Sequence, residues 1–330
     1  MCTAMTYRTN HHYFGRNLDL ECSYGEQITI TPRKFPFVFR RVQALPTHYA
    51  MIGVAHPTEV LPLYYEATNE KGLSMAGLNF PGLAVYQTPA DHQDNLAPFE
   101  CIPWILGQCA TVREARSLLD RLHLIDLAFS ETLPLTPLHW LLADREEAVV
   151  LEPTADGLQI YNNPVGVLTN SPAFPYHLTN LCQYAGLRTD SPENHFSFSL
   201  SPYSRGLGAF GLPGDFSSTS RFVKAAFLRQ NSHSEPTETA SVHQFFHLLQ
   251  AVAMPRGSVK VGTKDEITVY SSCCNTDRGI YYYTTYENSM ITAVDLHLEN
   301  LDGRQLISYP FASHTGFQFQ NKCTKNRGKN

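Results

Sequence analysis

Cys2 is the residue whose type and position could do chemistry with the least help from the rest of the chain. A small residue after the initiator Met1 permits removal of that methionine, which would leave cysteine as the first residue. A cysteine thiol has a reference pKa of about 8.5 and an α-amine one of about 7.7–8.0, so the amine can accept the thiol proton. An N-terminal cysteine thus carries its own general base. Amide hydrolysis would also need hydrogen-bond donors for the tetrahedral oxyanion.

The segment that follows could place charged groups beside this cysteine. The first twenty residues predict a hairpin of two strands around a turn near Asn10. Paired residue numbers then sum to about 20, so Cys2 faces the region of residue 18, flanked by Arg16 and Asp19. These two residues differ by an odd number, so both reach Cys2 only at a bulge or at the end of a strand. The alternative is an ordinary N-terminal strand with a cysteine at its second position.

Three other patterns imitate functional motifs. Residues 206–211 match GxGxxG, but Pro213 follows where a dinucleotide site needs a helix. His243 and His247 have helical spacing, yet a glutamine stands where a metalloprotease needs glutamate, so we expect packed or solvent-edge histidines. The adjacent pair 273–274 cannot easily aim two thiolates at one metal. None of these three patterns therefore predicts a nucleotide or metal site.

Strand patterns cluster at both ends of the chain, and helical patterns lie in the middle. The strand-like segments are 27–31, 35–42, 49–54, 72–80, 138–143, 148–152, 158–161, 280–286 and 290–296. Helical periodicity with N-terminal capping residues predicts helices over 111–122, 220–230 and 241–254. The strands pair as hairpins instead of alternating with helices, which favours an α+β fold. With no repeat and no linker, residues 1–330 are predicted to form one domain.

The overall composition excludes several classes of partner. The net charge is −5, and hydrophobic residues make up 43% of the chain, so we expect a globular protein without nucleic acid or an anionic membrane as partner. Eight cysteines in 330 residues are too sparse for a disulfide framework. No signal peptide and no transmembrane segment is visible, which predicts a cytoplasmic protein with reduced, mostly buried thiols.

Around Cys2 and at several later segments, the chain resembles the choloylglycine hydrolase family of N-terminal nucleophile amidases, which includes conjugated bile acid hydrolases and penicillin V acylases. The resemblance covers nearly the whole chain in order. The matching segments are MCT (1–3), FGRNLD (14–19), NEKGL (69–73), AGLNFP (76–81), LTNSP (168–172), GLPGDF (211–216), SRF (220–222), IYYY (280–283) and YEN (286–288).

The resemblance implies a fold and a set of roles. The fold would be a four-layer αββα sandwich, usually assembled as a homotetramer, with no cofactor. Cys2 would be nucleophile and, through its freed amine, base. Asp19 would hold that amine, and Arg16 would favour the thiolate.

The same resemblance assigns the remaining catalytic positions. Asn170, by its side-chain amide, and Asn79, by its backbone N–H, would form the oxyanion hole. Arg221 would lie near the thiol and stabilise developing charge.

The resemblance also implies a substrate. Bile acid hydrolases of this family tend to have asparagine at the position of Asn79, where penicillin V acylases tend to have tyrosine. The expected substrate is therefore a glycine- or taurine-conjugated bile acid, which needs an apolar cleft. Segments 60–65 and 127–129 are apolar enough to line one, although they could equally be buried in the core or at a subunit contact. The candidate substrate-binding residues are Leu18, Tyr24, Leu63, Tyr65, Phe129 and Arg205.

Two other functions stay open at this level. One is penicillin V acylase activity, and the other is steroid binding by an inactive protein of the same fold. Transfer of the acyl group to an amine is an expected side activity, because an amino acid can replace water at the thioester. Arg205 stands in a Ser-Arg-Gly segment that resembles the loop of glycine-preferring enzymes, although a cation there could pair with a carboxylate or a sulfonate.

Overall fold

Two antiparallel sheets packed face to face form the centre of the fold, in a computed structural model that describes residues 1–56, 58, 60–312 and 320–321. Within that part of the chain, the first sheet has seven strands in the order β12-β1-β2-β14-β15-β16, with β13 paired to β14. Its strands are β1 (Cys2–Arg8), β2 (His12–Leu20), β12 (Val167–Leu168), β13 (Val259–Val261), β14 (Lys264–Asn275), β15 (Ile280–Thr285) and β16 (Thr292–Asp295).

The second sheet has eight described strands in the order β11-β10-β9-β6-β5-β4-β3-β17. Its strands are β3 (Gln27–Thr31), β4 (Met51–His56), β5 (Leu63–Asn69), β6 (Ser74–Asn79), β9 (Leu138–Ala143), β10 (Ala148–Thr154), β11 (Gly157–Asn162) and β17 (Ile307–Pro310). A separate parallel pair joins β7 (Asp94–Leu96) to β8 (Leu122–Leu124).

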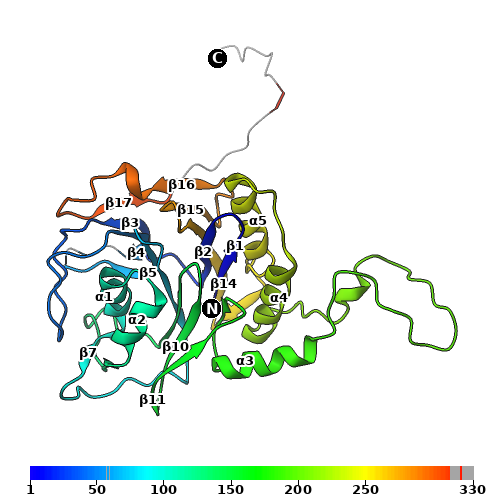
Figure 1. The fold of residues 1–330 in the computed structure, drawn as a ribbon, viewed down its shortest axis with the longest axis horizontal. Helices are drawn as coiled ribbons and strands as arrows, with labels where there is room; N and C mark the ends of the chain where they lie inside the picture. The colour runs from blue at the N-terminus through cyan, green and yellow to red at the C-terminus, as the bar shows by residue number, and fades with distance from the viewer. Residues whose placement is uncertain (57, 59, 313–319, 322–330) are drawn as a thin grey trace.

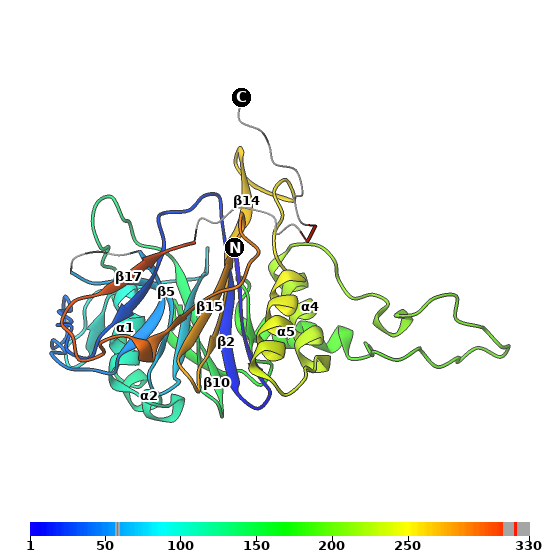
Figure 2. The same ribbon diagram turned by 90° about the horizontal axis from the view of Figure 1, so that it is seen from above.

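Helices cover the outer face of each sheet (Figure 2). The second sheet is covered by α1 (Cys101–Gln108) and α2 (Val112–Leu119), and the first by α4 (Ser218–Asn231) and α5 (Glu238–Gln250). Helix α3 (Phe174–Leu181) packs against α4. Short 3₁₀ turns are η1 (Pro98–Glu100), η2 (Cys182–Tyr184), η3 (Leu207–Ala209) and η4 (Leu296–Leu298). This order of layers confirms the αββα sandwich implied by the resemblance.

The core is divided by the second sheet. One apolar cluster contains Cys2 and fills the space between the sheets and beneath α4 and α5, and a second lies between the second sheet and α1 and α2. Central strands are therefore covered on both faces, and β14 is buried without interruption from Glu266 to Asn275. Such a strand lacks the apolar–polar alternation of a half-exposed one, which is why the sequence analysis did not identify it.

Most predicted elements are confirmed, including the first hairpin, the meander of β9, β10 and β11, and the β15–β16 hairpin. Helix α5 begins at Glu238, earlier than expected, because the Thr237 side chain accepts the Ala240 N–H. The strand predicted over 35–42 is wrong: it contains only an isolated bridge between Phe37 and Leu45. Its alternating phenylalanines pack into the second cluster without forming a ladder.

The segment between η2 and α4 extends away from the four layers (Figures 1 and 2). It contains Arg205 and the 206–211 glycine motif, and Gly206 and Gly211 both adopt positive φ angles, of 80° and 93°. Only the short η3 turn forms there. A dinucleotide site would require a helix that begins at the motif, and none does. Among the described residues, no helix is both long enough and apolar enough to cross a membrane.

Candidate active site

Cys2 begins β1 and lies directly opposite Leu18 of β2, the pairing expected from the sequence. Residues directly opposite in an antiparallel pair share a face, so the Cys2 side chain lies on the same face as Leu18 and Arg16. That face is turned toward the second sheet, because Arg16 donates hydrogen bonds to β5 and β6. The thiol is therefore buried between the two sheets, with Cys2 only 3% exposed.

Asp19 reaches the same region from the other face of β2. It lies just beyond the last β1–β2 pair, where its backbone exchanges hydrogen bonds of 2.8 and 3.0 Å with Met1. Arg16 and Asp19 lie on opposite faces of β2, and both reach the region of Cys2 because Asp19 is at the end of the β1–β2 pairing. Opposite Asp19, β14 also carries a bulge after Thr268, and the Thr268 hydroxyl donates to Asp19 Oδ1 at 2.6 Å.

The other carboxylate oxygen of Asp19 has no hydrogen-bond partner among the described residues. Burial raises the pKa of this carboxyl group, although Arg221, the Thr268 hydroxyl and the terminal amine oppose the increase. In this structure Met1 is present and its amine pairs with Glu266, so the Cys2 nitrogen is a peptide nitrogen. Asp19 therefore keeps one unpaired oxygen beside the start of β1.

Arg16 is a fully buried cation that joins the two sheets. Its Nη1 donates to the carbonyl oxygens of Gly77, at 2.6 Å, and Tyr65, at 3.0 Å, and lies 3.8 Å from the Glu66 carboxylate. Burial alone would lower the pKa of Arg16, but the negative charges of the ionised forms of Cys2, Tyr270 and Glu66 outweigh this effect and raise it. The guanidinium thus supplies a permanent positive charge on the face of the first sheet to which the thiol belongs.

Glu66 balances the charge of this cation, although no motif in the sequence points to it. Its carboxylate accepts hydrogen bonds from the hydroxyls of Tyr270, at 2.6 Å, Tyr281 and Ser272. Burial raises the pKa of Glu66, and Arg16 and these hydroxyls oppose the increase. The available signal was a single acidic residue between the apolar residues 63–65 and 67, because a buried carboxylate needs paired partners.

Asn170 and Arg221 hold the backbone of Cys2 from opposite ends of its peptide unit. The Cys2 N–H donates to Asn170 Oδ1 at 2.8 Å, and Arg221 donates to the Cys2 carbonyl oxygen and to Thr3 Oγ1. Arg221 also donates to Asn170 Oδ1 at 2.8 Å. The other end of the Asn170 amide, Nδ2, donates to the Asn79 carbonyl oxygen at 2.7 Å. Four of the predicted catalytic residues are therefore linked by hydrogen bonds.

The ends of three strands bring these residues together. In the β1–β12 pair Ala4 faces Leu168, so Asn170, just beyond β12, falls level with Cys2. Asn79 is the last residue of β6 and is exposed, unlike the five residues before it. Arg221 comes from the first turn of α4, which Ser217 caps by accepting the Ser220 N–H. Strand ends leave backbone groups free to face a substrate.

The predicted substrate-binding residues divide into two groups. Leu18 and Tyr65 belong to, or pack against, the apolar cluster that contains Cys2. Tyr24, on the loop after β2, is 56% exposed. Leu18 and Tyr65 thus share the apolar cluster with Cys2, whereas Tyr24 is not a member of it among the described residues.

The remaining substrate-binding candidates lie elsewhere. Leu63 packs against the second cluster, and the ring of Phe129 contacts Phe99 edge-on, with 5.2 Å between centroids. Arg205 is exposed on the extended segment between η2 and α4. The structure does not bring these side chains to Cys2 within one chain.

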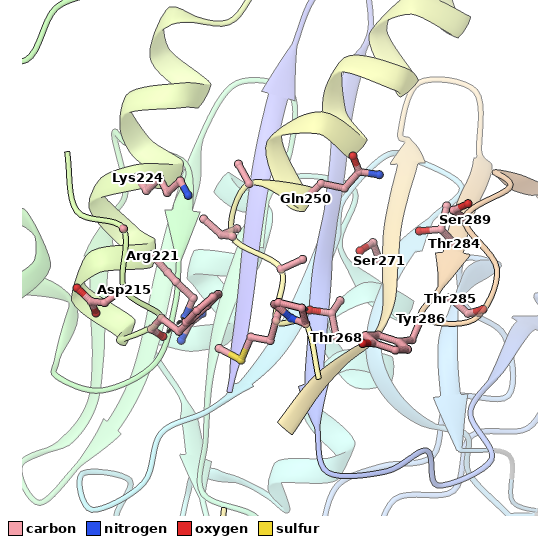
Figure 3. Close-up of a pocket in the computed structure, with 17 residues that line it drawn as sticks. Asp215, Arg221, Lys224, Gln250, Thr268, Ser271, Thr284, Thr285, Tyr286 and Ser289 are labelled. Carbon is pink, nitrogen blue, oxygen red and sulfur yellow. Dashed lines mark hydrogen bonds between the residues drawn. The ribbon is translucent and has the colours of Figure 1, made fainter. Parts of the chain in front are cut away.

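A cavity of about 440 Å³ approaches the site from the helix-covered face of the first sheet (Figure 3). Arg221 and Lys224 of α4 line one wall, and Thr268 of β14 lines another. Thr268 faces Asp19 and not the thiol, so this cavity adjoins the charged residues behind the start of β1. It lies on the opposite face of the first sheet from the Cys2 side chain.

The motifs set aside in the sequence occupy ordinary positions. His243 and His247 are exposed on α5, and Cys273 and Cys274 are buried in β14. Among the described residues, no group of three or more potential ligands could hold a metal ion. The other described cysteines are free, with Cys101 and Cys109 buried and Cys22 and Cys182 exposed; Cys323 lies outside the described residues.

Comparison with known proteins places this arrangement in a family. Residues 2–309 match the family described as linear amide C–N hydrolases, choloylglycine hydrolase family. The chain belongs to this family. A choloylglycine hydrolase family member is an enzyme that hydrolyses linear amide C–N bonds, and this chain is therefore an amidase.

Relatives in the family match along almost their whole length. The chain is 53% identical over 320 residues to a bile salt hydrolase/transferase of Lactiplantibacillus plantarum, covering 96% of this chain and 99% of that protein. Its structure resembles the C2A mutant of the conjugated bile acid hydrolase from Clostridium perfringens, with a TM-score of 0.89, 36% identity, and coverage of 97% and 100%.

A more distant solved structure shares the fold alone. Penicillin V acylase from Agrobacterium tumefaciens matches with a TM-score of 0.72 and 18% identity, over 93% of this chain and 90% of that one. Together with the nearer match, it confirms the N-terminal nucleophile hydrolase type of αββα sandwich.

Proposed function

We propose that this choloylglycine hydrolase family member cleaves the amide bond of glycine- or taurine-conjugated bile acids, with Cys2 as nucleophile. The observation that carries the proposal is the linked set of hydrogen bonds from Arg221 and Asn170 to the Cys2 peptide unit and on to Asn79. The substrate class comes from the printed names of relatives, which are bile salt or conjugated bile acid hydrolases.

Removal of Met1 would turn the Cys2 nitrogen into a free α-amine. The unpaired oxygen of Asp19 and the Asn170 side-chain oxygen are the acceptors available to hold that amine. The amine takes the thiol proton, and the thiolate attacks the amide carbon. The proton then passes to the leaving nitrogen, so that glycine or taurine departs and a thioester joins the bile acid to Cys2. Water, activated by the same amine, hydrolyses the thioester.

Asn79 and Asn170 would supply the oxyanion hole. One Asn170 Nδ2 proton is used by the Asn79 carbonyl oxygen, at 2.7 Å, and the other is left for the developing oxyanion. The Asn79 backbone N–H at the end of β6 would be the second donor. Each such donor typically contributes about 2.7–4 kcal/mol to the stability of the transition state.

The two buried arginines would support charge at the sulfur and at the reacting carbonyl. Arg16 lies on the same face of the first sheet as the thiol, and Arg221 donates a hydrogen bond to the Cys2 carbonyl oxygen. A nearby guanidinium favours the thiolate over the thiol. These local cations matter because the net charge of −5 gives an anionic substrate no general attraction.

The finer features of the function are proposals as well. Leu18, Tyr24 and Tyr65 would contact the steroid, and Arg205 would reach a conjugate in a homotetramer of single-domain, cytoplasmic subunits. An amino acid that attacks the thioester instead of water would be acylated, which is the proposed transferase side activity.

Parallel assays on glycocholate, taurocholate and penicillin V test the substrate class. We expect the highest kcat/KM on a bile acid conjugate and no hydrolysis by Cys2→Ala. The control is Cys182→Ala, which removes an exposed cysteine outside the site and should keep full activity. A preference for penicillin V would replace the proposed substrate, and hydrolysis by Cys2→Ala would overturn the nucleophile.

Intact-mass analysis after iodoacetamide treatment tests the non-enzymatic alternative of steroid binding. We expect loss of Met1 and fast alkylation of Cys2. A retained Met1 together with an inert Cys2 would favour a steroid-binding protein, because a blocked amine cannot act as base.

A further inference from the structure

A buried histidine–carboxylate pair lies behind the two asparagines of the proposed oxyanion hole. His139 of β9 and Glu152 of β10 are both fully buried, with His139 Nδ1 3.1 Å from Glu152 Oε1. His139 pairs across the sheet with Leu78, the residue before Asn79. The reaction steps described above use neither member of the pair. A buried charged group outside the chemistry calls for a reason to be there.

The first contact of His139 reaches the segment that carries Asn170. Its Nε2 lies 2.9 Å from the carbonyl oxygen of Thr169. A carbonyl oxygen only accepts, so the proton of this hydrogen bond is on Nε2. With a proton on Nε2, the contact between Nδ1 and Glu152 Oε1 needs one further proton, shared between the ring and the carboxyl group. This second hydrogen bond fixes the orientation of the ring.

The second contact of His139 reaches the segment that carries Asn79. The imidazole stacks on the ring of Phe80, with 4.3 Å between centroids and 9° between planes. Phe80 directly follows Asn79 and is fully buried. One ring therefore touches the residue after one oxyanion donor and the residue before the other.

Glu152 also anchors a second histidine. Its Oε1 accepts the N–H of Phe174, the first residue of α3, at 2.9 Å. One turn later, His177 Nε2 donates to the carbonyl oxygen of Asn170 at 2.9 Å. A carbonyl oxygen only accepts, so the proton of this bond is on Nε2, and burial lowers the pKa of His177. Glu152 thus supports hydrogen bonds to two successive carbonyl groups, those of Thr169 and Asn170.

We propose that His139 and Glu152 are positioning residues that set the distance between the Asn79 and Asn170 oxyanion donors. The proposal rests on the proposed function, because it assumes that these two asparagines bind the oxyanion. The donors come from different strands, β6 and the end of β12, and are joined directly by the 2.7 Å hydrogen bond from Asn170 Nδ2 to the Asn79 carbonyl oxygen. That single bond leaves the placement of the two backbone segments to their neighbours. His139 spans the two strands, and Glu152 holds His139 and α3 in place.

If His139 and Glu152 position the oxyanion donors, their loss should lower kcat and leave substrate binding unchanged. A displacement of about 1 Å at a reacting group can cost about 100-fold in rate. Ground-state contacts to the steroid would be unchanged, so KM should stay nearly constant. Alkylation of Cys2 by iodoacetamide has no oxyanion and needs no such donors. A defect confined to the oxyanion hole therefore lowers amide hydrolysis and spares alkylation.

The matched variants are His139→Phe and His48→Phe. Phenylalanine at 139 can keep the stacking on Phe80 but loses both hydrogen bonds. His48 is a buried histidine remote from the site that also contacts two carbonyl oxygens, those of Tyr49 at 2.7 Å and Phe35 at 2.9 Å. Its ring lies 4.3 Å from that of Phe37. His48→Phe therefore reproduces the structural cost of the change without touching the oxyanion segments.

We expect His139→Phe to lower kcat about 10- to 100-fold, with KM and the rate of Cys2 alkylation within about threefold of wild type. His48→Phe should keep kcat within about threefold. Equal losses of kcat in the two variants, a parallel loss of alkylation in His139→Phe, or an unchanged kcat would each overturn the positioning role.

Glu152→Gln is the second variant if His139→Phe does not fold, because it keeps the size of the side chain and an oxygen for Phe174. We expect it to lower kcat at least about threefold with KM and alkylation unchanged, and an unchanged kcat would overturn the proposal. Each rate is compared with wild type on the amide that wild type cleaves. A wild type inactive on glycocholate would overturn the proposed substrate and leave this comparison to be made on penicillin V.

Discussion

Arg221 donates a hydrogen bond from Nη2 to Asn170 Oδ1 at 2.8 Å, and the Cys2 N–H donates to the same oxygen. Two donors at Oδ1 determine which end of the Asn170 amide is oxygen. The Nδ2 end must then face Asn79, to which it donates. Arg221 thus orients a neutral amide as well as supplying charge, and this orientation is what an oxyanion donor requires.

Asn170→Asp tests this orientation with a side chain of the same size. The change replaces the Nδ2 donor by an oxygen, so we expect kcat on a conjugated bile acid to fall by about 10²–10³. Steady-state kinetics measure kcat, and a thermal unfolding curve measures whether the variant keeps its stability. The control is Asn180→Asp on α3, outside the site, which should keep wild-type kinetics. A tenfold or smaller loss in Asn170→Asp would mean that this amide is not a principal donor.

Glu66→Gln should change how stability depends on pH. Burial raises the pKa of Glu66 above its reference value of 4.5, against the opposing effect of Arg16. Between pH 4.5 and the raised pKa of Glu66 in the folded protein, the folded protein binds a proton that the unfolded chain has released. This group therefore makes the free energy of unfolding fall as pH rises. Urea unfolding from pH 4.5 upward should show a flatter profile for Glu66→Gln. A steeper decline of stability with pH in the variant would mean that folding lowers the pKa of Glu66 instead of raising it.

Asp215→Asn should have the opposite pH signature. Hydrogen bonds from Ser217 and Ser220 at the start of α4 lower the pKa of Asp215 from 3.8 to about 2. This stabilisation is present above the unfolded value and is lost as pH falls toward the folded one. We expect the variant to lose at most about 1 kcal/mol at pH 7, because the carboxylate is exposed. Thermal unfolding at pH 7 and near pH 2 tests this, since the difference should disappear in acid.

Gly15→Ala should destabilise the sheet that carries Arg16. A methyl group at Gly15 would lie 1.9 Å from the Ser272 carbonyl oxygen on β14, so the two strands would have to separate. We expect a loss of about 2–3 kcal/mol in the free energy of unfolding, as for an overpacked core. Gly214→Ala is the matched control, because its methyl group would meet no atom within 4 Å. Equal stability of the two variants would show that β2 and β14 adapt easily.

Local patterns were sufficient for much of the fold. The turn near Asn10 determines the register of the first hairpin, because pairing in a hairpin is set by its turn, and Cys2 does face Leu18. The Thr111 cap of α2 is also present, with Thr111 Oγ1 accepting the Glu114 N–H at 3.1 Å. Glu114 itself binds the Ala110 N–H instead of completing a capping box.

The same local patterns failed for a strand that is buried on both faces and for a buried segment that pairs with no strand. Residues 35–42 alternate like a strand, but their phenylalanines fill the space beside α1 without a neighbouring strand. In β14, continuous burial hid a long central strand. Periodicity reports exposure on one face only, so it gives no signal for a strand covered by a sheet on one side and helices on the other.

By itself, the sequence determined the nucleophile candidate at the start of the chain, the strand that faces it, and, through its family motifs, the type of fold. Only the tertiary structure decided how Asn79 and Asn170, 91 residues apart, meet beside Cys2, and which groups pair with the buried Arg16. The reason is that turns and caps depend on neighbouring residues, whereas these contacts depend on how two sheets and a helical layer pack. His139 and Glu152 carry no local motif, and their relation to both asparagines exists only in the packed protein.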